Sequence, residues 1–159
     1  MNTVFYPGSF DPITNGHLDI IHRATKIFDS LRIVVMHNAK KKYVFDLQER
    51  VKMIEDSIGE LNDTVKVETH DGLLVDYCKR TEVFTAIRGL RALTDFDYEF
   101  QMALTNRQMD DRVESVLFVT NINYSYVSSS LVKEIASYNG DISFLVPKPV
   151  EIMLKEKYQ

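Results

Sequence analysis

The chain has 159 residues, of which 45% are apolar and 26% charged, and a net charge of −4 at pH 7. This length predicts one domain over residues 1–159 with a buried core. The negative charge disfavours a broad nucleic-acid-binding surface. No basic N-terminal region precedes an apolar stretch, and no apolar run is long enough to cross a bilayer, so we expect a cytoplasmic protein without a membrane or nucleic-acid partner.

Strand-like and helix-like segments alternate along the chain. Short apolar runs predict strands over residues 3–6, 31–37, 64–69, 83–88 and 115–119. Apolar residues at helical spacing predict helices over residues 17–29, 46–58, 72–81, 94–109 and 129–138. A short strand over 143–146 and a final helix over 150–158 follow. The pattern indicates an α/β fold, a single doubly wound (Rossmann-like) domain with a mostly parallel sheet and a C-terminal helix.

Two local features support this assignment. Asp46 and Glu49 stand three residues apart at the start of the second predicted helix, which is a variant of the capping box. The single cysteine, Cys78, has apolar neighbours and follows Tyr77, so we expect a buried thiol rather than a nucleophile.

The loop at residues 6–17, with the sequence YPGSFDPITNGH, holds two of the four prolines and two of the six glycines. It lies between a predicted strand and a predicted helix, where backbone N–H groups and the helix dipole favour an anion. Gly8 and Gly16 would allow close approach, with His17 within reach. An ordinary Pro/Gly turn is the alternative. The loop matches neither the dinucleotide fingerprint nor the P-loop. A metal site at Asp11 and His17 is disfavoured because no second histidine stands at ligand spacing.

An anionic ligand would need local cations. The candidates are three groups: Lys40, Lys41 and Lys42 after a predicted strand, Arg88 and Arg91 in the segment IRGLR, and Arg107. The lysine run could equally be a solvated loop. The two arginines of the IRGLR segment follow a strand at its C-terminal end, where open α/β sheets bind ligands.

Residues 124–130, YSYVSSS, precede the predicted helix 129–138. Hydroxyls and N–H groups at a helix start offer a second phosphate site, although N-capping in a polar turn is the simpler alternative. The acidic residues Asp95, Asp97 and Glu99 at the start of helix 94–109 could simply complement its dipole.

Four segments in this order resemble the bacterial phosphopantetheine adenylyltransferases: YPGSFDPITNGH at 6–17, IRGLR at 87–91, DFDYE at 95–99 and VSSSLVKE at 127–134. The resemblance covers essentially the whole chain. It implies transfer of AMP from ATP to 4′-phosphopantetheine with Mg²⁺ as cofactor, giving dephospho-coenzyme A and pyrophosphate, and a homohexamer. Ser9 and Val127 stand where many members have threonine and isoleucine, and both changes keep the chemistry.

The resemblance also implies roles for individual residues. His17 would stabilise the transition state. 4′-Phosphopantetheine would contact four residues, which are Ser9, Lys41, Leu74 and Arg88. ATP would contact two loops, a strand end and one helix residue, which are Ser9, Phe10, His17, Gly89, Leu90, Arg91, Glu99, Tyr124, Ser125, Tyr126, Val127, Ser128, Ser129 and Ser130. Which of Lys40, Lys41 and Lys42 contacts substrate is left open, as are the ligands of the metal.

The chemistry favours a stabilising role for His17. A phosphate oxygen of the acceptor is already anionic near neutral pH, so positioning and charge stabilisation must carry the catalysis without a general base. Three other interpretations are a nucleotidylyltransferase that uses another phosphorylated acceptor, a non-catalytic ATP-binding module and a structural subunit. The last is disfavoured because the unusual residues concentrate at strand ends.

Overall fold

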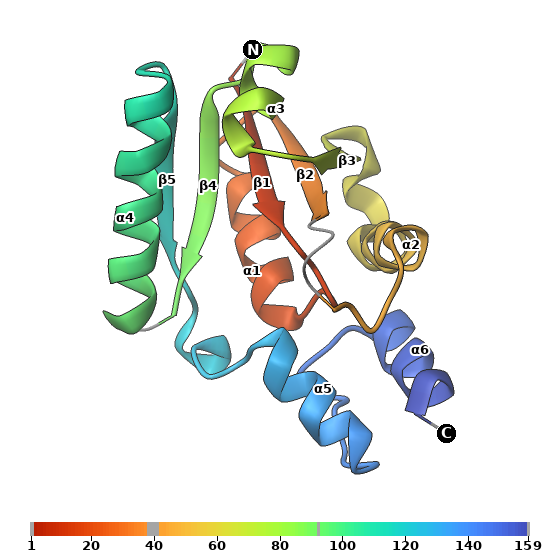
Figure 1. Cartoon of the computed structure of the whole chain (residues 1–159). Helices are drawn as coiled ribbons and strands as arrows, with labels where there is room; N and C mark the ends of the chain where they lie inside the picture. The colour runs from red at the N-terminus through yellow and green to blue at the C-terminus, as the bar shows by residue number, and fades with distance from the viewer. Residues whose placement is uncertain (1, 38–41, 92, 159) are drawn as a thin grey trace.

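The computed structural model describes residues 2–37, 42–91 and 93–158. Strands and helices alternate from β1 to β5, followed by two helices (Figure 1). The strands are β1 (Thr3–Gly8), β2 (Ser30–His37), β3 (Val65–Asp71), β4 (Thr85–Leu90) and β5 (Glu114–Val119). The α-helices are α1 (Asn15–Ala24), α2 (Leu47–Ile58), α3 (Leu74–Thr81), α4 (Leu93–Met109), α5 (Ser129–Ser137) and α6 (Lys148–Tyr158), and two 3₁₀ turns are η1 (Gly59–Asp63) and η2 (Ile122–Tyr124).

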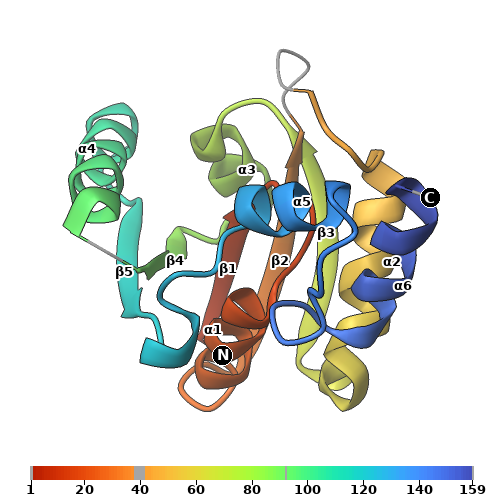
Figure 2. The ribbon, with the colours of Figure 1, turned by 90° about the horizontal axis from the view of Figure 1, so that it is seen from below.

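The strands form one sheet in the order β3-β2-β1-β4-β5, and every neighbouring pair is parallel. The α/β prediction is therefore confirmed. Figure 2 shows α3 and α4 on one side of the sheet, with α1, α2 and α6 on the other. Because the chain leaves β1 toward one face and β4 toward the other, a crevice opens at the C-terminal ends of these two strands. Helix α5 lies at this end of the sheet (Figure 1).

Both faces of the sheet are apolar. The larger core lies under α1, α2, α5 and α6 and includes Ile33 and Ile54, both fully buried. The smaller core packs α3 against the other face, where the Phe5 and Tyr77 rings lie 5.0 Å apart. Cys78 is fully buried here, and burial raises the pKa of its thiol to about 11, as expected of an inert cysteine. Among the described residues, no helix is long and apolar enough to cross a membrane.

Helix boundaries follow the caps. Asp46 accepts from the Glu49 N–H at 2.9 Å and Glu49 accepts from the Asp46 N–H at 2.8 Å, so the predicted capping box is present. Helix α1 begins two residues earlier than predicted, because Thr14 is its N-cap, and it ends at Ala24 rather than at residue 29.

The predicted strand over 143–146 is wrong. These residues form a turn in which the Leu145 and Val146 N–H groups both donate to Ile142 O. The side chains of Ile142, Leu145 and Val146 are buried in the larger core. A short apolar run predicts burial, and only its neighbours decide whether it is a strand or a buried turn.

Candidate active site

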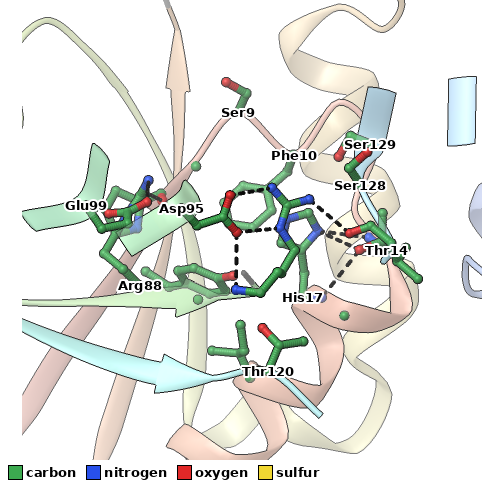
Figure 3. Close-up of a pocket in the computed structure, with 18 of the residues that line it drawn as sticks. Ser9, Phe10, Thr14, His17, Arg88, Asp95, Glu99, Thr120, Ser128 and Ser129 are labelled. Atoms are coloured by element: carbon green, nitrogen blue, oxygen red, sulfur yellow. Dashed lines mark hydrogen bonds and ion pairs between the residues drawn. The ribbon is translucent and has the colours of Figure 1, made fainter. Parts of the chain in front are cut away.

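The loop after β1 closes on itself around one aromatic ring. Phe10 has a positive φ of 46°, and its ring is buried edge-on against the rings of Tyr6 and His17. A Cβ at Gly8 would lie 2.9 Å from the Phe10 ring, so only glycine fits there. The ring therefore packs beneath the loop and leaves the Ser9 side chain above it (Figure 3).

Asp11 anchors the loop to two other segments. Its buried carboxylate accepts from the Val44 N–H at 3.1 Å, the Phe45 N–H at 3.0 Å and the Lys133 ammonium at 2.8 Å. These bonds join the loop to the segment before α2 and to α5. Asp11 is thus fully engaged within the protein, and the described residues hold no cluster of three metal-ligating side chains.

A buried arginine supports the loop from behind. Arg50 of α2 is fully buried, and its guanidinium donates to Ser9 O at 2.8 Å and Met36 O at 3.3 Å and lies 4.1 Å from the Tyr43 ring centroid. This residue was not predicted from the sequence. The signal was available, since position 50 falls on the apolar face of a helix, where a charged residue needs internal acceptors.

His17 presents one ring nitrogen to the cavity in a defined protonation state. Its Nδ1 accepts from the Thr14 N–H at 3.0 Å, so the proton of the neutral ring is on Nε2. Burial, followed by the charges of Arg91 and Arg88, lowers the pKa of His17 to about 4. The ring is therefore neutral at physiological pH and can donate one hydrogen bond from Nε2.

Arg88 is held rigidly at the end of β4. Its Nε and Nη2 donate to the two Glu99 carboxylate oxygens at 2.8 and 2.7 Å, and its Nη1 donates to Pro7 O at 2.6 Å. Burial acts to lower the pKa of Arg88, but the ion pair with Glu99 outweighs it and the pKa is raised. The remaining N–H groups of this permanent cation are available to an anion. Glu99, predicted to contact ATP, lies beside the cavity as the partner that orients Arg88.

Arg91 and the start of α5 form the other side of the cavity. Arg91 pairs with Asp95 and donates from Nη1 to Val127 O at 3.0 Å. The Ser128 hydroxyl caps α5 by accepting from the Leu131 N–H at 3.1 Å, and the Ser129 hydroxyl donates to Pro12 O at 2.7 Å. The first N–H groups of α5 have no partner inside the helix and favour an anion.

Two cavities meet at this crevice. The first has a volume of about 310 Å³ and lies between the loop after β1, the ends of β4 and β5, and the start of α5. The second, of about 420 Å³, extends between the ends of β2 and β4 and helix α4. Both are lined by Pro7, Gly8, Ser9, Arg88 and Glu99, so the two cavities are adjacent.

Most of the predicted site residues gather here. The first cavity is lined by the predicted residues Ser9, Phe10, His17, Arg88, Gly89, Arg91, Glu99, Val127, Ser128, Ser129 and Ser130. Leu74 lines the second cavity.

Other predicted residues lie elsewhere. Leu90, Tyr124, Ser125 and Tyr126 line neither cavity, and their contact with ATP stays a prediction. Lys40 and Lys41 are outside the described residues, and Lys42 is exposed. The exposed Arg107 pairs with Glu114 and lines neither cavity.

Several lining residues were not predicted. They include Tyr6, Ile20 and Thr120 in the first cavity and Met102 and Met109 in the second. Thr120 directly follows β5, and its position at the C-terminal end of a parallel strand was the available signal. The residues from α1 and α4 carried no signal, because apolar residues on a helix predict only a buried face.

Comparison with known proteins finds relatives over nearly the whole chain. Residues 5–135 match the family model described as cytidylyltransferase-like. A phosphopantetheine adenylyltransferase of Petrotoga mobilis is 49% identical over 152 residues, which are 96% of this chain and 93% of that protein. The chain belongs to the phosphopantetheine adenylyltransferase family. Relatives with the same name from Lachnoclostridium phytofermentans and Clostridium perfringens are 49% and 48% identical over 99% of this chain and 96% and 95% of theirs.

A solved structure supports the fold of the family. A putative nicotinate-nucleotide adenylyltransferase from Vibrio parahaemolyticus superimposes with a TM-score of 0.70 at 17% identity, covering 99% of this chain and 95% of that chain. The α/β fold is therefore shared with this solved structure. The family membership confirms the resemblance recognised from the four sequence segments.

Proposed function

We propose that this protein transfers AMP from ATP to 4′-phosphopantetheine, giving dephospho-coenzyme A and pyrophosphate, the penultimate step of coenzyme A synthesis. The adjacency of the two cavities at Ser9 and Arg88 carries the proposal, in agreement with the family. A nucleotide in one cavity and an acceptor in the other would place their phosphates together at this junction.

The linings of the two cavities differ in the way that the two substrates differ. The first cavity combines Arg91, His17 and the start of α5, which suit a triphosphate. The second is lined on one side by Leu73, Leu74, Met102 and Met109, which suit a long, flexible and weakly polar arm. Arg88 at the junction would hold the acceptor phosphate through the N–H groups that Glu99 and Pro7 do not use.

The reaction is an in-line displacement at the α-phosphorus. An acceptor phosphate oxygen forms the new P–O bond while the bond from the α-phosphorus to the bridging oxygen breaks, and pyrophosphate leaves with that electron pair. The second pKa of a phosphate monoester is about 6, so the attacking oxygen is ionised at neutral pH. No general base is needed, and the neutral His17 is suited to donate from Nε2 to the charge that develops on the α-phosphate.

Magnesium is expected from the resemblance. Mg²⁺ retains several waters and takes most other ligands from substrate phosphates. The carboxylates beside the first cavity, Asp95 and Glu99, are bound to arginines. This environment fits an ion that enters on the phosphates of ATP, without a dedicated protein site in the described residues. When bound, it would neutralise phosphate charge.

We also expect the protein to be a homohexamer in the cytoplasm, from the family resemblance. Exposed apolar side chains on α4 and the edge strand β5 are compatible with burial against another copy; they include Phe96, Phe100, Leu104, Val116 and Val119. Light scattering after size exclusion would test the assembly, and a monomer at working concentration would contradict it.

The central test is pyrophosphate release with ATP and a panel of acceptors, with the nucleotide product identified by mass spectrometry. We expect turnover with 4′-phosphopantetheine and none with pantetheine, nicotinamide mononucleotide or glycerol 3-phosphate. Leu74→Ala should raise the KM for 4′-phosphopantetheine and leave the KM for ATP unchanged. Preference for another acceptor, or ATP binding without turnover, would refute the proposal.

A further inference from the structure

One buried hydroxyl in the first cavity has no partner. Thr120 Oγ1 is the only buried side-chain polar atom without a hydrogen bond in the part of the chain that the structure describes. The residue is 8% exposed and lines the first cavity. Its backbone N–H donates to Leu90 O at 2.9 Å, so the residue is fixed at the end of β5 while its hydroxyl is left unused. An unsatisfied buried group of this kind requires an explanation.

The surroundings of Thr120 differ from the phosphate-binding side of the cavity. A Cβ atom added to Gly89 would lie 3.8 Å from Thr120 Oγ1 and 3.6 Å from the Tyr6 hydroxyl oxygen. It would also clash with the Ile20 side chain. Burial raises the pKa of Tyr6, so its hydroxyl stays protonated. This end of the cavity thus consists of bare backbone, an aliphatic side chain and two neutral hydroxyls.

Figure 3 shows how Thr120 lies in the cavity. It is across from Ser9, and its hydroxyl oxygen is turned toward the cavity. Ile20 follows His17 by three residues on α1, which corresponds to roughly 5 Å along the helix axis. A nucleotide whose phosphates lie at His17 and the start of α5 would therefore extend its uncharged end toward Ile20, Gly89 and Thr120.

A purine base matches this end of the cavity. A flat, mostly apolar ring can pack on Ile20, whose side chain fills the space beside the Gly89 backbone where a Cβ would otherwise lie. The ring edge also carries nitrogen donors and acceptors, and a threonine hydroxyl can bond either kind.

We infer that the Thr120 hydroxyl forms a hydrogen bond with a nitrogen of the adenine base and helps to determine the nucleotide specificity of the enzyme. The inference rests on the proposed function only in that it takes the first cavity as the ATP site. Thr120 takes no part in the chemical step, so its removal should change nucleotide affinity and leave acceptor affinity unchanged.

The test compares Thr120→Val, which keeps the shape but lacks the hydroxyl, with Thr120→Ser, which keeps the hydroxyl. Calorimetry with ATP alone should show binding weakened about tenfold in Thr120→Val and within about twofold of wild type in Thr120→Ser. Binding of inorganic tripolyphosphate should be the same in all three proteins. Thr64→Val, at an exposed threonine before β3, serves as the matched control and should bind ATP normally.

Base analogues locate the bond. The analogues are ATP derivatives that lack the 6-amino group or have carbon in place of N1, N3 or N7. One of them should bind the wild type about tenfold more weakly than ATP does, and its binding should be no weaker in Thr120→Val than in the wild type. The melting temperature of the ligand-free Thr120→Val protein should equal or exceed that of wild type, because an unpaired buried hydroxyl is removed. Thr120→Ala provides a second variant without the hydroxyl should valine not be accommodated.

Several results would overturn the inference. These are unchanged ATP binding in both hydroxyl-free variants, equal weakening of ATP and tripolyphosphate, or a Thr120→Val effect that persists with every base analogue and vanishes with 2′-deoxy-ATP. Failure of the wild-type protein to bind ATP would refute this inference and the proposed function together. ATP binding that depends on Thr120, combined with no turnover of 4′-phosphopantetheine, would refute only the proposed acceptor.

Discussion

Replacement of His17 tests the catalytic interpretation most directly. Because Nδ1 accepts from the Thr14 N–H, the ring can offer the substrate only the Nε2 proton, and His17→Ala removes that donor. Loss of one donor directed at developing charge typically lowers kcat by about 10² to 10³. An interaction made mainly in the transition state adds little to ground-state binding, so the KM for ATP should change by less than about threefold.

The same residue predicts a pH dependence of stability. The pKa of His17 is lowered from 6.5 to about 4 in the folded protein, mainly by burial and then by Arg91 and Arg88. Between these values the unfolded chain binds a proton that the folded protein does not, so stability falls as the pH falls through this window. From these two pKa values, the free energy of unfolding of the wild type should fall by about 2 kcal/mol between pH 8 and pH 5. A variant with a non-ionisable residue at position 17 should not show this loss.

Urea unfolding of the wild type and His17→Gln at pH 8, 7, 6 and 5 measures this difference. As the pH falls, the wild type should lose about 2 kcal/mol of its free energy of unfolding relative to the variant, with most of the change below pH 6.5. Steady-state kinetics with both substrates varied gives the catalytic part. A near-normal kcat in His17→Ala would refute the stabilising role, and a constant stability difference across pH would show that the ring is not held neutral by its site.

Three further predictions concern other residues. Arg88→Ala should raise the KM for 4′-phosphopantetheine more than that for ATP and Arg91→Ala the reverse, each about tenfold or more, because a charge-assisted contact is worth roughly 1.5 to 3 kcal/mol; equal losses for both substrates in steady-state kinetics would indicate one undivided cationic site. Asp11→Ala should destabilise the protein by roughly 3 to 5 kcal/mol in urea unfolding, because Lys133 and two backbone N–H groups lose their shared acceptor, and a loss below about 1 kcal/mol would contradict this. Cys78 should resist iodoacetamide at pH 8 in the folded protein and react in denaturant, since it is fully buried and burial raises its thiol pKa to about 11; rapid labelling without denaturant would contradict that burial.

The candidate phosphate-binding elements were predictable because the residues that define them are close together in the chain. Pro, Gly and a histidine between a strand and a helix, or serines at a helix start, specify N–H groups and hydroxyls within a few residues of one another. The arginine segment was predictable for a related reason, since the C-terminal ends of parallel strands lie at one edge of the sheet. Most residues identified in this way line the first cavity, including Ser9, His17 and Arg91.

Interactions between distant segments were not predictable from local patterns. One acceptor of the buried Arg50 is Ser9 O, 41 positions away in the sequence. Lys133 pairs with Asp11, which is 122 positions away. Glu99 was expected beside ATP, and only the packing of α4 against β4 showed that it orients Arg88. The prediction of a strand over 143–146 was wrong for the same reason, because the burial of this turn depends on helices formed by other parts of the chain.

Sequence alone therefore determined the α/β class, the alternation of elements, the family and the candidate phosphate-binding loops, because each of these depends on periodicity or on residues close together in the chain. The tertiary structure decided the tautomer and neutrality of His17, the pairing that aims Arg88 and the unpartnered hydroxyl of Thr120. These properties depend on burial and on neighbours brought together by the sheet, and electrostatic effects on a side chain are set by its surroundings in space rather than by its neighbours in sequence.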